Sequence, residues 1–180
     1  MPVASGVEPS AWRTAIITPV PKCTPVNEVS DLRPISVTPI LLLIVERLIV
    51  RDQIFPAIPT NEILDQYGFK PSGSTTEALV DSTHTISNML EGNNYVRCLL
   101  IDFSKAFDSI DNLTLVSKLK ALNIADNIIQ WVVQFLTDRN QFVKVGEMWS
   151  FTKLINRSIV QGSGIGPTLF IICIAYLRPT

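Results

Sequence analysis

Residues 95–108 read YVRCLLIDFSKAFD, and this stretch decides how the rest of the chain is interpreted. Its apolar run, residues 98–101 (CLLI), has the length of one strand and predicts a strand that is buried on both faces. The run ends at Asp102, and residues 103–107 predict a turn away from that strand. A carboxylate held at the end of a rigid strand is suited to bind a metal ion or to act as a general base. Asp102 is therefore the first candidate site residue.

The composition indicates a folded chain that leaves part of its apolar surface uncovered. The 180 residues suffice for one domain with its own core, or for parts of two domains that share one. Charged residues make up 17% of the chain, which is low and predicts apolar surface that meets a partner or further chain. The net charge of -1 excludes bulk attraction to nucleic acid, so such contact needs a local basic cluster. No apolar run reaches the roughly 18 residues of a membrane span, and the N-terminus lacks the pattern of a signal peptide.

Two cations flank a predicted turn near the N-terminus. Residues 12–20 have the composition of a strand, and the segment PVPKCTPVNEVSDLRPIS (residues 19–36) predicts a long connection or hairpin tip. Lys22 lies at one end of this segment and Arg33 near the other. Together they could clamp a triphosphate, Arg33 through its guanidinium fork and Lys22 as a point charge. Two solvated surface charges are the alternative, and the spacing alone leaves both open.

Local signals predict most of the remaining elements. Helices are predicted at residues 38–55, largely buried and begun by a Thr-Pro pair; 74–92, begun by a Ser-x-x-Glu capping box; 112–122, capped by Asp111 or Asn112; and 125–136, apolar on one face. Residues 141–155 predict a hairpin that turns at Gly146.

A glycine-rich segment, QGSGIGP at residues 161–167, precedes a predicted apolar helix at residues 168–177. Three glycines in six residues allow the backbone to approach a flat ligand closely. An ordinary tight turn before a helix explains the same residues equally well. The segment matches neither the Walker pattern nor G-x-G-x-x-G, which excludes those two phosphate-binding motifs here.

Six stretches, in this order, resemble the reverse transcriptase domain of non-LTR (LINE-like) retrotransposons. They are WRTAIITPVPK (12–22), SDLRPIS (30–36), QYGFKPSGSTTEAL (66–79), DFSKAFDSID (102–111), DRNQFVKV (138–145) and VQGSGIGPTLF (160–170). The resemblance implies an α+β fold, the fingers and incomplete palm of a right-hand polymerase, with an antiparallel sheet packed on helices. Residues 1–94 would form the fingers-like region and residues 95–180 the partial palm.

The resemblance also implies roles for particular residues. Asp102 matches the first catalytic aspartate and a metal ligand, and Phe103 would offer its backbone carbonyl to the same metals. Phe107 matches the aromatic residue beneath the sugar that disfavours a 2′-hydroxyl. Lys22 and Arg33 match the residues that hold the phosphates of the incoming nucleotide. Gln161 and Gly162 match the loop beside the nucleotide and template base. Asp108 and Asp111 have no such match and are interpreted as turn and cap residues.

The implied chemistry is transfer of a nucleotide to a primer 3′-hydroxyl, served by two Mg²⁺ ions about 3.5–4 Å apart. Two ions need a second acidic strand, which the family supplies as an aromatic-x-Asp-Asp hairpin downstream of the glycine-rich segment. The chain stops at Thr180 before such a hairpin. The isolated 180 residues are therefore expected not to extend a primer.

Two interpretations of the activity follow, and a third concerns the family branch. The chain is either a piece of a longer polymerase, working with an RNA template, a DNA primer and dNTPs, or an inactive remnant that at most binds nucleic acid. The third interpretation is an RNA polymerase or a group II intron-type maturase, because these proteins share the palm, and the sequence leaves this alternative open. By analogy with the family, the parent protein is expected to work in the cytoplasm and the nucleus and not to be secreted. The remaining palm and the thumb of the parent are expected partners of this chain.

Overall fold

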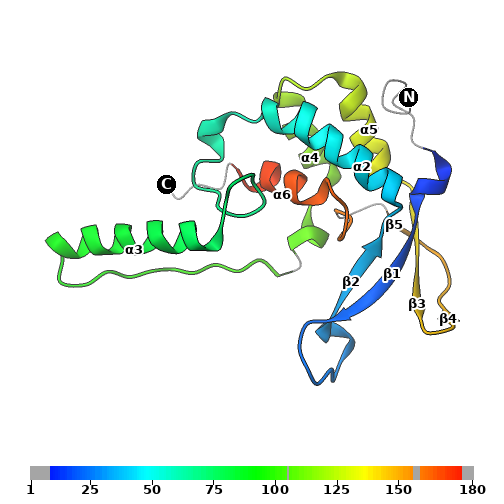
Figure 1. Cartoon of the computed structure of the whole chain (residues 1–180), viewed down its shortest axis with the longest axis horizontal. Helices are drawn as coiled ribbons and strands as arrows, with labels where there is room; N and C mark the ends of the chain where they lie inside the picture. The colour runs from blue at the N-terminus through cyan, green and yellow to red at the C-terminus, as the bar shows by residue number, and fades with distance from the viewer. Residues whose placement is uncertain (1–8, 105, 156–158, 176–180) are drawn as a thin grey trace.

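The computed structural model describes residues 9–104, 106–155 and 159–175, in which helices pack beside a five-stranded sheet (Figure 1). The strands are β1 (Thr14–Pro21), β2 (Leu32–Val37), β3 (Arg139–Val145), β4 (Met148–Trp149) and β5 (Lys153–Ile155). The α-helices are α2 (Ile40–Ile49), α3 (Thr75–Gly92), α4 (Asn112–Ala121), α5 (Asp126–Leu136) and α6 (Gly166–Ile174). Short helical segments are η1 (Ser10–Arg13), η2 (Val29–Asp31), η3 (Val50–Ile54), η4 (Phe55–Ala57), η5 (Thr60–Glu62) and η6 (Ala106–Ser109). The predicted α+β class is confirmed, but the sheet is mixed and not antiparallel as expected, because β1 and β3 pair in parallel.

The sheet is mixed because its two hairpins join through a parallel pair. β1 and β2 run antiparallel with Val20 opposite Arg33, and β3 pairs antiparallel with both β4 and β5. β1 pairs with β3 in parallel, with Thr14 opposite Asn140. The predicted hairpin at residues 141–155 is therefore present, and residues 19–36, predicted as a long connection or a hairpin tip, form the tip of the β1–β2 hairpin. The β1–β2 hairpin extends away from the helices, so its tip lies far from the core (Figure 1).

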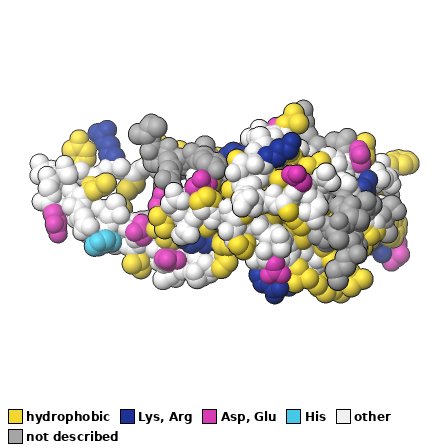
Figure 2. All heavy atoms as spheres, turned by 90° about the horizontal axis from the view of Figure 1, so that it is seen from above, with side chains coloured by type: hydrophobic (Ala, Val, Ile, Leu, Met, Phe, Trp, Pro, Cys, Tyr) yellow, Lys and Arg dark blue, Asp and Glu magenta, His cyan; other side chains and the backbone are white. Residues whose placement is uncertain are grey.

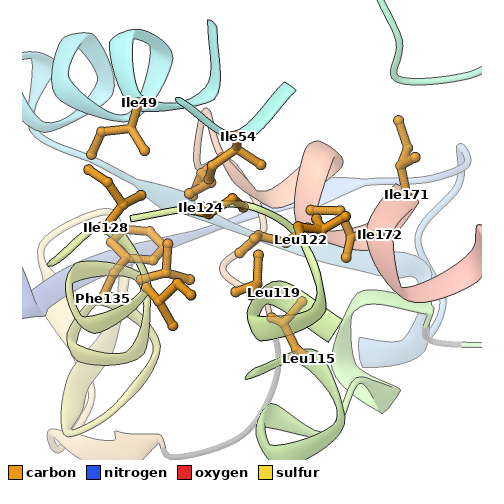
Figure 3. Packing of buried hydrophobic residues seen from close by; sticks show 14 of the residues in the cluster. Ile49, Ile54, Leu115, Leu119, Leu122, Ile124, Ile128, Phe135, Ile171 and Ile172 are labelled. Carbon is orange, nitrogen blue, oxygen red and sulfur yellow. The ribbon is translucent and has the colours of Figure 1, made fainter. Parts of the chain in front are cut away.

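The hydrophobic core lies between α2, η3, α4, α5 and α6 (Figure 3). One face of α5 supplies much of it, with Ile128, Ile129, Val132 and Leu136 buried as their helical spacing predicts. The Trp131 and Phe135 rings stack with centroids 5.5 Å apart. α6, which is apolar all round, is buried along most of its length between these helices. The core thus fixes the start of α6, where the glycine-rich segment ends.

Capping residues set two helix starts as predicted. The side chain of Ser74 accepts a hydrogen bond from the backbone N–H of Glu77 at 3.1 Å, and α3 begins at the next residue. The carboxylate of Asp111 accepts from the N–H of Thr114 at 2.9 Å and begins α4. Although α3 has the predicted bounds, none of its described side chains is buried, and the helix forms an arm beside the core (Figure 1).

No strand forms at residues 95–102, so the buried strand predicted from the apolar run at residues 98–101 is wrong. This segment runs beside α3 without regular secondary structure, and Leu99, Leu100 and Ile101 are 84%, 93% and 74% exposed (Figure 1). A strand needs a neighbour to hydrogen-bond with its backbone, and no strand of the described residues pairs with this segment. The apolar run therefore stays extended and uncovered.

The prediction of a largely buried helix at residues 38–55 is also partly wrong. α2 begins at Ile40 without a side-chain cap from Thr38, and η3 continues it as a π-helical turn. Leu42 is buried, but Ile40 and Leu41 are 76% and 68% exposed. Only one face of α2 meets the core, because nothing in the described part of the chain covers the other.

The chain has a large accessible surface, and many of its exposed side chains are apolar. Its accessible area is 12,097 Å², whereas a complete globular protein of 20.0 kDa has about 8,700 Å². Figure 2 shows hydrophobic side chains scattered over the face in view, with Lys and Arg side chains dispersed among them. This agrees with the low charged fraction of the sequence. None of the described helices is long and apolar enough to cross a membrane.

Candidate active site

The glycine-rich segment is attached on two sides. The backbone N–H of Ser36 in β2 donates to the carbonyl of Gln161 at 2.8 Å. Two residues earlier, the N–H of Ile159 donates to the carbonyl of Phe107 in η6 at 2.9 Å. Residues 159–166, called the glycine loop from here on, therefore bridge the N-terminal hairpin and the segment that follows Asp102.

Gly162 permits the close approach of the glycine loop to β2. Its φ angle is +99°, a conformation that other residues rarely adopt. A Cβ atom at this position would lie 2.5 Å from the carbonyl oxygen of Ser36, which is closer than real atoms come. Glycine at this position therefore lets the loop backbone lie against β2, while the approach of a flat ligand to the same segment stays a prediction.

The far end of the glycine loop is held by a buried acid. The N–H of Ile165, just before α6, donates to Oε2 of Glu46 at 2.9 Å. Glu46 is fully buried on α2. A carboxylate near the first N–H groups of a helix is favourable, because the helix dipole places partial positive charge there. Glu46 therefore ties the start of α6 to α2.

The side chain of Gln161 turns toward η6. Its Nε2 lies 3.4 Å from Oδ1 of Asp108, and both residues line a pocket of about 620 Å³. Ile17, Pro34 and the buried Ser36 form part of the pocket wall on the β1–β2 hairpin. Asp108 was expected to be a turn residue, and it does lie in a short 3₁₀ helix, but it also contacts the glycine loop.

Lys22 and Arg33 lie near the tip of the hairpin, as the sequence suggests. Lys22 donates through Nζ to the carbonyl of Ser30 at 2.8 Å, and its N–H donates to the carbonyl of Asp31 at 2.7 Å. Asp31 orders the turn by accepting from the N–H groups of Asn27 and Glu28 at 2.9 and 3.1 Å. These backbone hydrogen bonds lower the pKa of the Asp31 carboxyl. The hairpin tip is thus internally bonded, with both cations at its sides.

The two faces of β2 carry different parts of the candidate site. Successive side chains of a strand point to opposite faces, so Arg33 and Ile35 share one face and Pro34 and Ser36 the other. Pro34 and Ser36 line the pocket. On the Arg33 face, Cγ2 of Ile35 would lie 3.3 Å from a Cβ built on Gly162. The side chain of Arg33 therefore lies on the face of β2 opposite the pocket, and Gly162 lies against the strand backbone at Ser36.

The aromatic residues after Asp102 pack onto α6. The rings of Phe107 and Phe170 have centroids 5.2 Å apart, and Phe103 lies 6.5 Å from Phe170 edge to face. Phe69, from the loop before α3, contacts both Phe107 and Phe170, with ring centroids 6.1 and 6.2 Å apart. This aromatic cluster places the residues that follow Asp102 against α6.

Asp102 itself is exposed and belongs to no regular element. Among residues 9–104, 106–155 and 159–175, no group of three His, Cys, Asp or Glu side chains is arranged to hold a metal ion. The structure thus brings Phe107, Gln161 and Gly162 together. Asp102 is linked to them through Phe103 and Phe107, which follow it in the chain and pack on α6.

Three further residues of the site were not predicted from the sequence. Ser36 and Asp108 make contacts that join segments far apart in the chain, which spacing does not reveal. Glu46 did leave a signal, because it is the one acid within the apolar run ILLLIVERLI of α2. An acid there is costly unless it meets a polar partner inside the protein.

Comparisons with known proteins give one family match and several relatives. The family described as reverse transcriptase (RNA-dependent DNA polymerase) matches residues 20–178. The RNA-directed DNA polymerase from mobile element jockey of Drosophila melanogaster is 32% identical over 172 residues, 92% of this chain and 18% of its own length. The probable RNA-directed DNA polymerase from transposon BS of the same species is 30% identical over 165 residues, 90% of this chain and 18% of its own.

A third relative, from Popillia japonica, is more distant. It is the retrovirus-related Pol polyprotein from type-1 retrotransposable element R2, 24% identical over 166 residues, 92% of this chain and 23% of its own length. The chain thus spans about a fifth of the length of these relatives. Since the family match covers most of the 180 residues, the chain belongs to the reverse transcriptase (RNA-dependent DNA polymerase) family.

Proposed function

We propose that the chain carries the nucleotide-binding part of an RNA-directed DNA polymerase, which adds nucleotides from dNTPs to a DNA primer on an RNA template. The observation that carries this proposal is the glycine loop, bonded to β2 through Ser36 and to η6 through Phe107. These contacts join three of the six stretches by which the sequence resembles the family. In the proposed division they would join the fingers-like region, residues 1–94, to the partial palm, residues 95–180.

Each nucleotide-binding residue has a role that its chemistry suits. Arg33 and Lys22 would hold the triphosphate, Arg33 by paired hydrogen bonds and Lys22 by charge. Gln161 and Gly162 would lie beside the sugar and base. Phe107 would lie beneath the sugar, and its contact with Phe170 supports a fixed ring there.

Asp102 and the backbone carbonyl of Phe103 would supply oxygen ligands for Mg²⁺, the kind that this ion prefers. Bound there, the ion would neutralise charge on the phosphates. One carboxylate and one carbonyl do not make a two-ion site, and the described residues offer no cluster that completes it. The described residues of this chain therefore bind and orient the nucleotide, and the rest of the palm and thumb are proposed as partners.

Nucleotide binding by the 180-residue chain tests the proposal. Titration with dATP and Mg²⁺ should give saturable binding that weakens as salt is added, because salt screens the exposed cations. Arg33→Ala should weaken binding about tenfold or more, since hydrogen bonds to charged groups contribute about 1.5–3 kcal/mol. Lys120→Ala, which removes an exposed cation from α4, serves as the matched control and should change nothing.

Binding that is equal in Arg33→Ala and Lys120→Ala would refute the phosphate role. Primer extension by the same chain is expected to be absent, with or without Asp102→Ala, because the metal site is incomplete. Extension that disappears in Asp102→Ala would overturn that expectation and assign catalysis to the chain itself.

A further inference from the structure

The glutamine amide at residue 161 can face its surroundings in two ways. Its nitrogen donates hydrogen bonds and its oxygen accepts them, so the orientation decides which end is offered to a ligand. In the structure Nε2 lies 3.4 Å from Oδ1 of Asp108. An ionised carboxylate carries no hydrogen and can only accept, so the nitrogen of Gln161, not its oxygen, must face Asp108.

The backbone around Gln161 is fixed by other groups. Its carbonyl accepts from the N–H of Ser36, and the next residue, Gly162, lies directly against β2. Asp108 is held at the other side, because its neighbour Phe107 accepts from the N–H of Ile159. With both backbones held, only rotation of the two side chains remains free at this contact, and the contact with Asp108 restrains the rotation of Gln161.

We propose that Asp108 is a positioning residue that holds the Gln161 amide with its nitrogen toward η6 and its oxygen available to accept a hydrogen bond from the nucleotide. A hydroxyl of the sugar or an amino group of the base supplies such a donor. Within the described part of the chain, no residue donates a hydrogen bond to this oxygen. The inference rests on the proposed nucleotide binding for its consequence, but the orientation of the amide is measurable without any nucleotide.

The test compares Asp108→Ala, Asp108→Asn and a matched control, Asp65→Asn, which changes an exposed acid elsewhere. The first measurement is the NMR signal of the Gln161 side-chain NH₂ group, identified by its loss in Gln161→Ala. Asp108→Ala should move this signal, and Asp65→Asn should not. Asp108→Asn keeps a carbonyl acceptor and should largely preserve it, so rescue by the conservative variant separates positioning from a general structural effect.

The second measurement is the affinity for dATP with Mg²⁺. Asp108→Ala should weaken binding about threefold to tenfold, the range expected for one hydrogen bond, and Asp108→Asn less than twofold. In the Gln161→Ala background, Asp108→Ala should have no further effect, because a residue that acts through another loses its role when that other is removed.

The outcomes separate this inference from the proposed function. An NH₂ signal that is unchanged in Asp108→Ala overturns the positioning role, and so does an undiminished effect of Asp108→Ala in the Gln161→Ala background. If the wild-type chain binds no dATP, the proposed function fails, and the NH₂ signal alone still decides whether Asp108 holds Gln161.

Discussion

Removing the buried acid Glu46 should loosen the glycine loop and destabilise the whole chain. Its Oε2 accepts from the N–H of Ile165 at 2.9 Å, at the start of α6, and the side chain is fully buried. In Glu46→Ala this N–H loses its acceptor in the protein interior, which costs about 1–3 kcal/mol, more where the lost partner is charged. The space left by the side chain adds to that cost.

Three substitutions divide this effect into its parts. Glu46→Ala should lower the free energy of unfolding by about 3 kcal/mol. Glu46→Leu fills the space but leaves the N–H unsatisfied and should cost about 1–3 kcal/mol. Glu46→Gln keeps an acceptor and loses only the charge at the helix start, so a cost of about 1 kcal/mol is expected. Glu91→Ala, on the exposed arm α3, is the control and should have little effect.

Urea unfolding of each variant measures these differences, and amide hydrogen exchange locates them. The Ile165 N–H should exchange faster in Glu46→Ala and Glu46→Leu than in Glu46→Gln. The reasoning is refuted if Glu46→Ala unfolds within about 0.5 kcal/mol of the wild type, or if Glu46→Gln is as damaging as Glu46→Ala.

Three further outcomes are expected. Gly162→Ala should cost about 1–3 kcal/mol of unfolding free energy, because its positive φ and the nearby β2 carbonyl exclude a side chain, and a stability equal to wild type would contradict this. Arg139→Lys should cost about 1.5–3 kcal/mol in the same assay, since the buried guanidinium donates to two separate backbone carbonyls, at 2.9 and 3.2 Å, and an ammonium cannot span both. Burial raises the pKa of the Cys173 thiol, so at pH 8 iodoacetamide should alkylate Cys173 more slowly than the exposed Cys23. The difference between the two alkylation rates should narrow as the pH rises, because more of the Cys173 thiol is then ionised. Equal rates at pH 8 in the native chain would argue against a raised pKa.

Signals that act within a few residues predicted the elements well. Ser74 and Asp111 begin α3 and α4 because a cap bonds the backbone three residues ahead, a relation visible in the sequence. The apolar face of α5 is likewise a matter of local spacing. These features do not depend on how the rest of the chain folds.

Features that depend on distant segments were not predicted, or were predicted wrongly. The run at residues 98–101 has every local property of a buried strand, yet a strand also needs a neighbour to pair with, and among the described residues none is present. The contact between Asp108 and Gln161 spans 53 residues, and that between Arg139 and the Trp12 carbonyl spans 127. Neither contact produces a repeating pattern in the sequence, because each joins a single pair of polar groups.

The site residues are not all held equally firmly. Gln161 and Gly162 are fixed by β2 through Ser36, and that position rests on the core through Glu46 and α6. Asp102 has no such support, because its anchors are the aromatic contacts of Phe103 and Phe107 with α6. The glycine loop, which we propose contacts the nucleotide, is therefore held in place by contacts within the described residues, whereas Asp102, the proposed metal ligand, belongs to no regular element and rests on its two aromatic neighbours alone.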